Sequence, residues 1–167
     1  MKYILKTNKF KNYAVIINMV IKMAEPKMAT FKAEVDKKKG MECEARMRDF
    51  TLTIDEPDNL GGTDKGPNPV EVLLSSLGGC LSIVGVVVAK EMDLELEDFK
   101  LKIEGDLDPR GFMGTADVPS GFQSIRVKID EIQGIPEDKM DEFLKKIQNR
   151  CPIEDTLKRK LDVKIEK

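Results

Sequence analysis

Histidine and tryptophan are both absent from this sequence of 167 residues. Without histidine, the chain cannot build a Ser-His-Asp triad, a Cys-His pair or an imidazole-ligated metal site. Aromatic residues make up only 5% of the chain, which argues against a stacking platform for single-stranded nucleic acid. The 28 basic and 30 acidic residues give a net charge of −2, so nothing attracts the chain as a whole to nucleic acid or to an anionic membrane. We therefore expect neither partner, and no metal or organic cofactor.

Cysteine is scarce as well: Cys43, Cys80 and Cys151 lie far apart. Their odd number and wide spacing fit neither a secreted disulfide framework nor a CxxC zinc site. They fit a reducing compartment, and we expect a cytoplasmic protein whose thiols are free to be structural or reactive. The length favours one domain, and the 41% of hydrophobic residues is enough for a core.

Residues 1–29 differ from the rest of the chain. Four lysines precede an apolar run, an arrangement that is similar to the start of a signal peptide, but Asn18 interrupts the run and no small-x-small cleavage site follows it. Met23 and Met28 are both possible true starts. We interpret this part as an N-terminal extension, a mis-assigned start or a loose appendage rather than an ordered element or a signal. The domain is then predicted to span residues 30–167.

A second apolar stretch, residues 72–89, carries no charge and reaches the lower length of a membrane-spanning helix. Its glycines and serines make it only modestly apolar, and charges stand at both ends. We interpret it as the buried central helix of a soluble protein. Asn68 is predicted to cap this helix and Pro69 to begin it. The Glu71 carboxylate falls in the first turn, where the positive end of the helix dipole stabilises an anion.

The elements around this helix group strands with strands, which predicts an α+β fold of antiparallel sheets. A hairpin-rich meander is expected first, two longer strands follow the helix, and two further helices precede a final strand. A glycine-rich segment separates the two longer strands. The expected strands are residues 30–35, 41–48, 50–54, 99–104, 124–130 and 161–165. The expected helices are residues 69–92, a helix that begins at Pro136, and a short helix near residues 153–157. The helix that begins at Pro136 has an apolar stripe of Met140, Phe143, Leu144 and Ile147.

Two of the cysteines have local surroundings that suit chemistry. If Pro152 begins a helix, Cys151 is its N-cap, where free backbone N–H groups and the helix dipole favour a thiolate. Arg150 and Lys158 could add to this effect. The alternative is that Cys-Pro simply separates two helices.

Cys80 follows Gly78-Gly79 in the middle of the long helix, where small residues admit a close backbone or a ligand. A buried, unreactive cysteine is the alternative reading there. Cys43 lies on the apolar face of an expected strand and is predicted to belong to the core.

Three charged residues could assist a reactive sulfur. Arg46 and Arg48 lie on an expected strand, and an arginine near a sulfur stabilises its thiolate and binds polar oxygen atoms. Glu71 could orient such an arginine. Each has a simpler alternative: the arginines could be solvent-facing residues of a sheet, and Glu71 could be no more than a partner of the helix dipole.

The order of several short motifs resembles that of the OsmC/Ohr family (osmotically inducible protein C and organic hydroperoxide resistance protein). The resemblance covers roughly residues 30–167. It implies an α+β fold with a long buried helix, an intertwined homodimer with sites at the interface, and thiol peroxidase activity. The motifs are Leu60-Gly61-Gly62, Gly66-Pro67-Asn68-Pro69, Leu77-Gly78-Gly79-Cys80, Ser120-Gly121-Phe122 and Arg150-Cys151-Pro152-Ile153.

By position, Cys80 resembles the cysteine of the family that attacks the peroxide, and Cys151 resembles the resolving cysteine. The implied enzyme is a cysteine-based (organic) hydroperoxide reductase that passes through a sulfenic acid and a disulfide and is reset by a dithiol. Arg48 and Glu71 are predicted to complete the catalytic set. The alternative is a dimer of the same fold that binds a small ligand or senses redox state without turnover.

The sequence departs from the hydroperoxide-resistance branch at two places. That branch has a glutamate directly after Asn-Pro, where this chain has Val70, with Glu71 one residue later. The arginine of that branch falls near residues 37–39, which are all lysine here, so Arg48 or Arg46 would have to replace it. The chain is therefore more similar to the broad OsmC-like branch.

Overall fold

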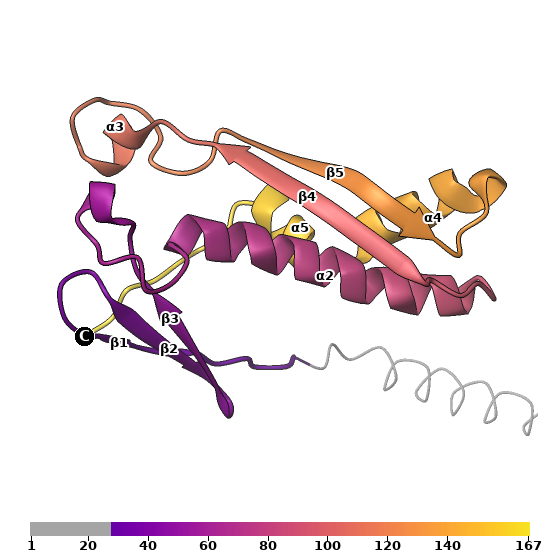
Figure 1. The fold of residues 1–167 in the computed structure, drawn as a ribbon, viewed down its shortest axis with the longest axis horizontal. Coiled ribbons are helices and arrows are strands. Elements are labelled where there is room, and N and C mark those ends of the chain that lie inside the picture. Colours follow the sequence, from indigo (N-terminus) through magenta and orange to yellow (C-terminus); the bar gives the residue numbers. More distant parts are fainter. Residues whose placement is uncertain (1–27) are drawn as a thin grey trace, which may run out of the picture.

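The computed structural model describes residues 28–167. Its centre is one long helix, α2 (Pro69–Glu91), which lies between two antiparallel sheets that share no strand (Figure 1). The three-stranded sheet comes first in the chain and the two-stranded sheet follows α2. This arrangement confirms the predicted α+β class with a central helix. The expectation for the N-terminal extension concerns residues that lie, apart from the last two, outside the described part.

The first sheet is the predicted meander, with strand order β1-β2-β3 and antiparallel pairing throughout. Strand β1 spans Glu34–Lys37, later than the expected 30–35, while β2 (Cys43–Met47) and β3 (Phe50–Ile54) lie where the alternation predicted them. Ala45 on β2 is buried, whereas Cys43 is only half-buried. The prediction that Cys43 belongs to the core is therefore wrong, because the sheet that carries it packs little against α2 in the described chain.

Helix α2 begins as its sequence predicts. Asn68 is the N-cap and Pro69 the first helical residue. The Asn68 side chain accepts a hydrogen bond from the Glu71 backbone N–H at 2.9 Å, and the Glu71 carboxylate accepts one from the Asn68 N–H at 2.8 Å. This reciprocal capping box satisfies two donors that a helix start otherwise leaves unpaired.

One face of α2 packs against the second sheet. That sheet pairs β4 (Asp98–Asp106) with β5 (Ser124–Gln133), and every second residue of β4 faces the helix. Gly78 allows the close approach, since a Cβ there would lie 2.8 Å from Cδ1 of Ile103. A register shift between Lys100 and Leu101 leaves one extra residue on β5, which lets hydrophobic side chains on both sides of the shift face the core.

The remaining helices close the core from the other side. Helix α4 (Glu137–Arg150) buries Phe143 and Ile147 from the predicted stripe, and α5 (Pro152–Lys158) follows after a single residue, Cys151. Phe143 meets Phe99 of β4 edge-to-face, with ring centroids 6.1 Å apart. The buried core consists of Leu77, Leu81, Val88, Ala89, Phe143, Ile147 and Cys151.

Two short helices interrupt the predicted loops. The 3₁₀ turn η1 (Asp58–Leu60) lies between β3 and α2, and α3 (Pro109–Phe112) lies in the glycine-rich segment between β4 and β5. The loop after β3 is held by Asp55, which is 1% exposed. Its carboxylate accepts hydrogen bonds from the side chain and backbone of Thr63 and from the backbone N–H groups of Glu56 and Lys65.

Two expectations differ from the structure. The final strand predicted for residues 161–165 is not a strand: these residues have no regular secondary structure, and Val163 and Ile165 are 83% and 99% exposed. Helix α2 was expected to be buried, but only 33% of its most apolar window is buried in the described chain. By length and composition it could cross a membrane, a test that the core helices of soluble proteins also pass. Both differences leave apolar surface without a partner inside one chain.

Candidate active site

The structure brings two cysteines together that are 71 residues apart in sequence. Cys80 lies in the middle of α2, and Cys151 is the residue that joins α4 to α5. The Cys151 thiol donates a hydrogen bond to the Cys80 sulfur, with the two Sγ atoms 3.1 Å apart. Both thiols are free. The pair is therefore one short movement away from a disulfide, whose sulfurs are about 2.05 Å apart.

Cys151 is the N-cap of α5, as its position before Pro152 predicted. Its sulfur accepts a hydrogen bond from the backbone N–H of Glu154 at 3.4 Å. However, burial raises the pKa of the Cys151 thiol, and this effect outweighs the hydrogen bond from Glu154. The expectation of a thiolate-like Cys151 is therefore wrong. The side chain is 0% exposed, and a charged sulfur would lose its hydration there.

The cations expected to help Cys151 are engaged elsewhere. Arg150 forms an ion pair with Glu91 and ties the end of α4 to the end of α2. Lys158 pairs with Glu154 on the same face of α5. Because both charges meet carboxylates, neither offsets the cost of burying a thiolate at Cys151.

Cys80 has more open surroundings than its partner. It is partly exposed, and the neighbouring Gly79 is exposed with no atom within 4 Å of the place where a Cβ would stand. Ser76 and Ile83, one turn before and after, are exposed on the same helix. Gly78 and Gly79 therefore differ in their surroundings: the first admits Ile103 of β4, and the second lies on the exposed face of α2.

The two candidate arginines do not join the pair within one chain. Arg48 lies in the turn between β2 and β3 at φ 58°, and its guanidinium stands 5.0 Å from the centre of the Phe50 ring. Arg46 bonds to the carboxylates of Asp36 and Glu44, each at 2.8 Å. The main packing partners of α2 are β4, α4 and α5, not the sheet that carries these arginines.

Glu71 is also engaged. Its carboxylate completes the capping box with Asn68, and the residue is exposed at the start of α2, more than two turns from Cys80. This geometry matches the alternative interpretation, in which Glu71 acts only at the start of the helix. Val70 beside it is half-buried. Of the four predicted site residues, the structure places Cys80 and Cys151 together and leaves Arg48 and Glu71 apart from them.

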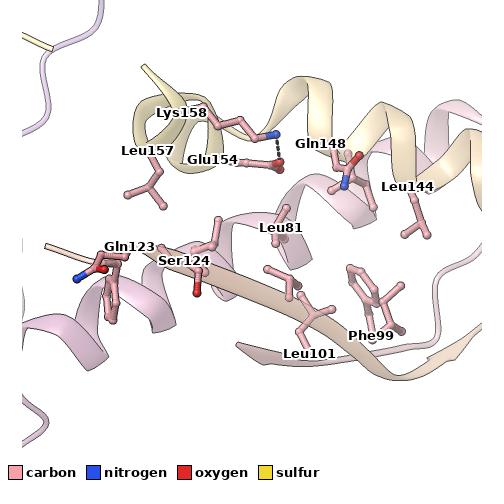
Figure 2. A pocket seen from close by; sticks show the side chains of 16 residues that line it. Leu81, Phe99, Leu101, Gln123, Ser124, Leu144, Gln148, Glu154, Leu157 and Lys158 are labelled. Carbon is pink, nitrogen blue, oxygen red and sulfur yellow. Dashed lines mark hydrogen bonds and ion pairs between the residues drawn. The ribbon is translucent and has the colours of Figure 1, made fainter. Parts of the chain in front are cut away.

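A cavity of about 450 Å³ lies between α2, the second sheet and the last two helices (Figure 2), and neither cysteine is among its lining residues. Leu77 and Leu81, which flank Cys80 on α2, form part of its wall, and so does Glu154, whose N–H bonds to Cys151. The Lys158–Glu154 ion pair lies at one end in Figure 2. The lining is otherwise mostly aliphatic and aromatic, including Phe99, Leu101, Phe122, Ile125, Ile129 and Leu144.

Sequence reasoning missed this cavity and the Asp55 network. The cavity depends on distant elements meeting, which no local pattern records. Asp55 directly follows an alternating strand and resembles any polar residue that opens a loop. Among residues 28–167, no group of three or more His, Cys, Asp or Glu side chains is placed to hold a metal ion.

The protein is an α+β protein with two antiparallel sheets around a central helix. Its partly exposed Cys80 on that helix is paired with the buried Cys151 at a helix junction. The family of OsmC-like proteins matches residues 62–166. The chain belongs to this family, which confirms the resemblance seen in its motifs. No curated protein matches the chain.

Solved structures share the fold. An OsmC-like protein from Mycoplasma pneumoniae is similar with a TM-score of 0.68 at 22% identity, over 78% of this chain and 89% of that one. A Legionella pneumophila protein described as an organic hydroperoxide resistance protein OsmC has a TM-score of 0.61 at 19% identity, over 80% and 92%. An organic hydroperoxide resistance protein from Elizabethkingia anophelis has a TM-score of 0.60 at 14% identity, over 80% and 91%.

Proposed function

We propose that this protein is a thiol-dependent reductase of organic hydroperoxides that uses Cys80 and Cys151. The observation that carries the proposal is the 3.1 Å contact between the two sulfurs. A two-cysteine cycle needs both sulfurs within bonding reach, with one open to substrate and the other close behind it. Membership in the OsmC-like family and the names of two similar structures support the same chemistry.

The proposed reaction has two oxidative steps. The Cys80 thiolate attacks one oxygen of ROOH, the O–O bond breaks, and the products are a sulfenic acid on Cys80 and an alkoxide that takes up a proton to give ROH. The Cys151 thiol then attacks the Cys80 sulfur, the S–O bond breaks, and water leaves as the disulfide forms. A dithiol reductant returns both cysteines to thiols and becomes a disulfide itself.

The surroundings of the two sulfurs support this division of roles. Cys80 is partly exposed, so a peroxide can reach its sulfur more easily than that of Cys151. Cys151 is fully buried and its pKa is raised by that burial, so it remains a thiol that substrate does not reach. The apolar cavity, whose wall includes Leu77 and Leu81 on either side of Cys80 in the sequence, suits a substrate with a hydrocarbon part rather than hydrogen peroxide alone.

We also propose that the working unit is a cytoplasmic homodimer. The exposed apolar residues on α2 form one long unpartnered face, and such a patch marks a contact surface. The sheet β1–β3 and the C-terminal residues carry further exposed apolar side chains. A second copy of this chain would cover these surfaces, and neither nucleic acid nor membrane is needed. The α2 residues concerned are Leu73, Ile83, Val86 and Val87.

Two serine variants test the roles of the cysteines. Cys80→Ser should abolish consumption of an organic hydroperoxide, because no nucleophile remains at the open position. Cys151→Ser should consume one equivalent and stop, leaving a sulfenic acid that dimedone traps on Cys80. Cys43→Ser is the matched control and should keep full turnover. Peroxide turnover by Cys80→Ser would reject the assignment.

The cavity favours a second candidate function, binding of a small apolar ligand without turnover. Its volume of about 450 Å³ lies within the range of ligand sites. A fluorescent fatty-acid probe that binds equally to wild type and to Cys80→Ser, in a protein that leaves hydroperoxide unchanged, would favour this candidate over the reductase.

A further inference from the structure

The buried Cys151 thiol has a hydrogen-bond partner on each side. Its sulfur accepts a hydrogen bond from the backbone N–H of Glu154 at 3.4 Å, and its S–H donates to the Cys80 sulfur at 3.1 Å. The Glu154 N–H already supplies a donor to the Cys151 sulfur, so the hydrogen of the thiol is free to point to Cys80. The two contacts therefore form a relay that runs from α5 through Cys151 to Cys80.

Burial keeps the middle group of this relay protonated. Cys151 is 0% exposed, and burial raises the pKa of its thiol. The thiol therefore stays neutral at pH values where an ordinary cysteine begins to ionise. A neighbour that keeps its proton can donate to a thiolate on Cys80, whereas a second thiolate at that distance would repel it.

A thiolate on Cys80 needs such a donor. Cys80 is half-buried, and a charged group that loses part of its hydration must be hydrogen-bonded instead. Within one chain the candidate arginines are engaged elsewhere, Arg46 with two carboxylates and Arg48 at the ring of Phe50. Among residues 28–167, the hydrogen bond that reaches the Cys80 sulfur comes from Cys151.

We propose that Cys151 acts before it resolves the sulfenic acid: its S–H stabilises the Cys80 thiolate that attacks the peroxide. The proposal rests on the proposed function, and it gives a second catalytic role to a residue assigned only the resolving step. The backbone N–H of Glu154 supports this role, because a thiol that accepts a hydrogen bond becomes a stronger donor itself.

The proton of Cys151 is accounted for in both steps. While the Cys80 thiolate attacks the peroxide, the proton stays on Cys151 as the hydrogen of the donor. In the next step the Cys151 sulfur bonds to the Cys80 sulfur, the S–O bond of the sulfenic acid breaks, and the same proton leaves with the hydroxyl as water. No other base has to reach this buried position, and the chain has no histidine to serve as one.

The first test measures the reactivity of Cys80 without peroxide. In a Cys43→Ser background, Cys151→Ala removes the donor, and Cys151→Ser replaces its S–H by an O–H. Without the donor we expect about tenfold less thiolate at pH 7, offset by an about threefold gain in the nucleophilicity of that thiolate. Alkylation of Cys80 by iodoacetamide, mapped by mass spectrometry, should therefore be about threefold slower in Cys151→Ala. Cys151→Ser should react at a rate close to that of the background protein.

A second pH separates the loss of a donor from a change of access. At about pH 10.5, where thiols are largely ionised, Cys151→Ala should react about threefold faster than the background protein, because its thiolate lacks a hydrogen bond. Cys151→Val, which fills the space without a donor, should behave like Cys151→Ala, so the test does not depend on the folding of one variant. Equal rates at pH 7 overturn the proposal. A rate lowered by the same factor at both pH values reflects access and overturns it as well.

The same variants distinguish this proposal from the proposed function. With an organic hydroperoxide, Cys151→Ala and Cys151→Ser both stop at the sulfenic acid, and its formation, followed by trapping with dimedone, should be about threefold slower in Cys151→Ala at pH 7. Equal trapping rates in the two variants overturn the role of Cys151 in the attack. If no variant reacts with the hydroperoxide but the difference in alkylation remains, the proposed function is rejected and the donor role of Cys151 is supported.

Discussion

The molecule has two regions that differ in how much hydrophobic core they contain. The C-terminal body (α2, β4, β5, α4 and α5) has a hydrophobic core in which Val88 and Phe143 are 0% exposed. The N-terminal sheet (β1–β3) has little apolar interior. Among its described residues and the loop that follows, the buried side chains are Ala45 and the charged Asp55. The body is held by hydrophobic packing, whereas the sheet is held by the pairing of its strands and its following loop by hydrogen bonds to the Asp55 carboxylate.

This difference explains where the candidate site stands. The cysteine pair belongs to the body, where distant elements are fixed firmly enough to hold two sulfurs 3.1 Å apart. The sheet carries both candidate arginines but packs little on α2 within one chain. The sheet is therefore the region whose position in the working protein depends most on the proposed second copy.

The largest expected effect comes from breaking the core of the body. Phe143→Ala should lower the free energy of unfolding by about 3–5 kcal/mol, because it leaves a cavity against Phe99. Phe50→Ala is the matched change in the sheet, where the ring is 62% exposed, and should cost less than about 1 kcal/mol. Urea unfolding followed by circular dichroism measures both. Equal losses would contradict the contrast between the regions.

The next effect concerns assembly. Ile83 is 70% exposed on the unpartnered face of α2, and Ile83→Asp should place an unpaired charge in the proposed dimer contact. Sedimentation should change from the mass of two chains to that of one. Lys90→Asp, which adds a carboxylate near the end of the same helix, should still sediment as two chains. A wild-type protein of single-chain mass would reject the proposed dimer.

A smaller effect should appear in the polar interior beside the sheet. The Thr63 hydroxyl, followed by three backbone N–H groups, holds the pKa of Asp55 below its usual 3.8. The ionised carboxylate therefore stabilises the fold above that value, and the stabilisation is lost as the pH falls through the lowered pKa. Asp55→Asn should lower Tm at pH 7 and reduce the loss of Tm on acidification. An unchanged Tm at pH 7 would show that the network contributes nothing.

The smallest predicted effect concerns Arg48, which we propose assists Cys80 from the second copy. Arg48→Ala should slow formation of the Cys80 sulfenic acid several-fold, because a guanidinium stabilises a thiolate and binds the peroxide oxygens. Stopped-flow measurement with an organic hydroperoxide gives the rate. Arg46→Ala is the control, since Arg46 already pairs with Asp36 and Glu44. Equal rates for wild type and Arg48→Ala would remove Arg48 from the mechanism.

Local sequence patterns predicted the elements that depend on local rules. The Asn68-Pro69 start of α2, the stripe containing Phe143 and Ile147, and the Cys151 N-cap all appear in the structure. The alternation also predicted the meander. These features follow from backbone capping and side-chain periodicity, which act within a few residues.

Other features depend on partners that no local pattern shows. The alternation of residues 161–165 predicted a strand, but a strand needs a neighbour and the described chain offers none. The cap at Cys151 predicted a thiolate, but burial by α2 and α4 outweighs the cap. The pairing of Cys80 with Cys151 came from family resemblance, since 71 residues separate them.

The most direct test of the two-cysteine cycle treats the reduced protein with one equivalent of an organic hydroperoxide and determines its intact mass and thiol connectivity. The proposed cycle predicts a loss of two hydrogens per chain, with Cys80 joined to Cys151 and Cys43 still free. An unchanged mass with all three thiols free would contradict the central claim that the contact between the two sulfurs is a peroxide-reducing site.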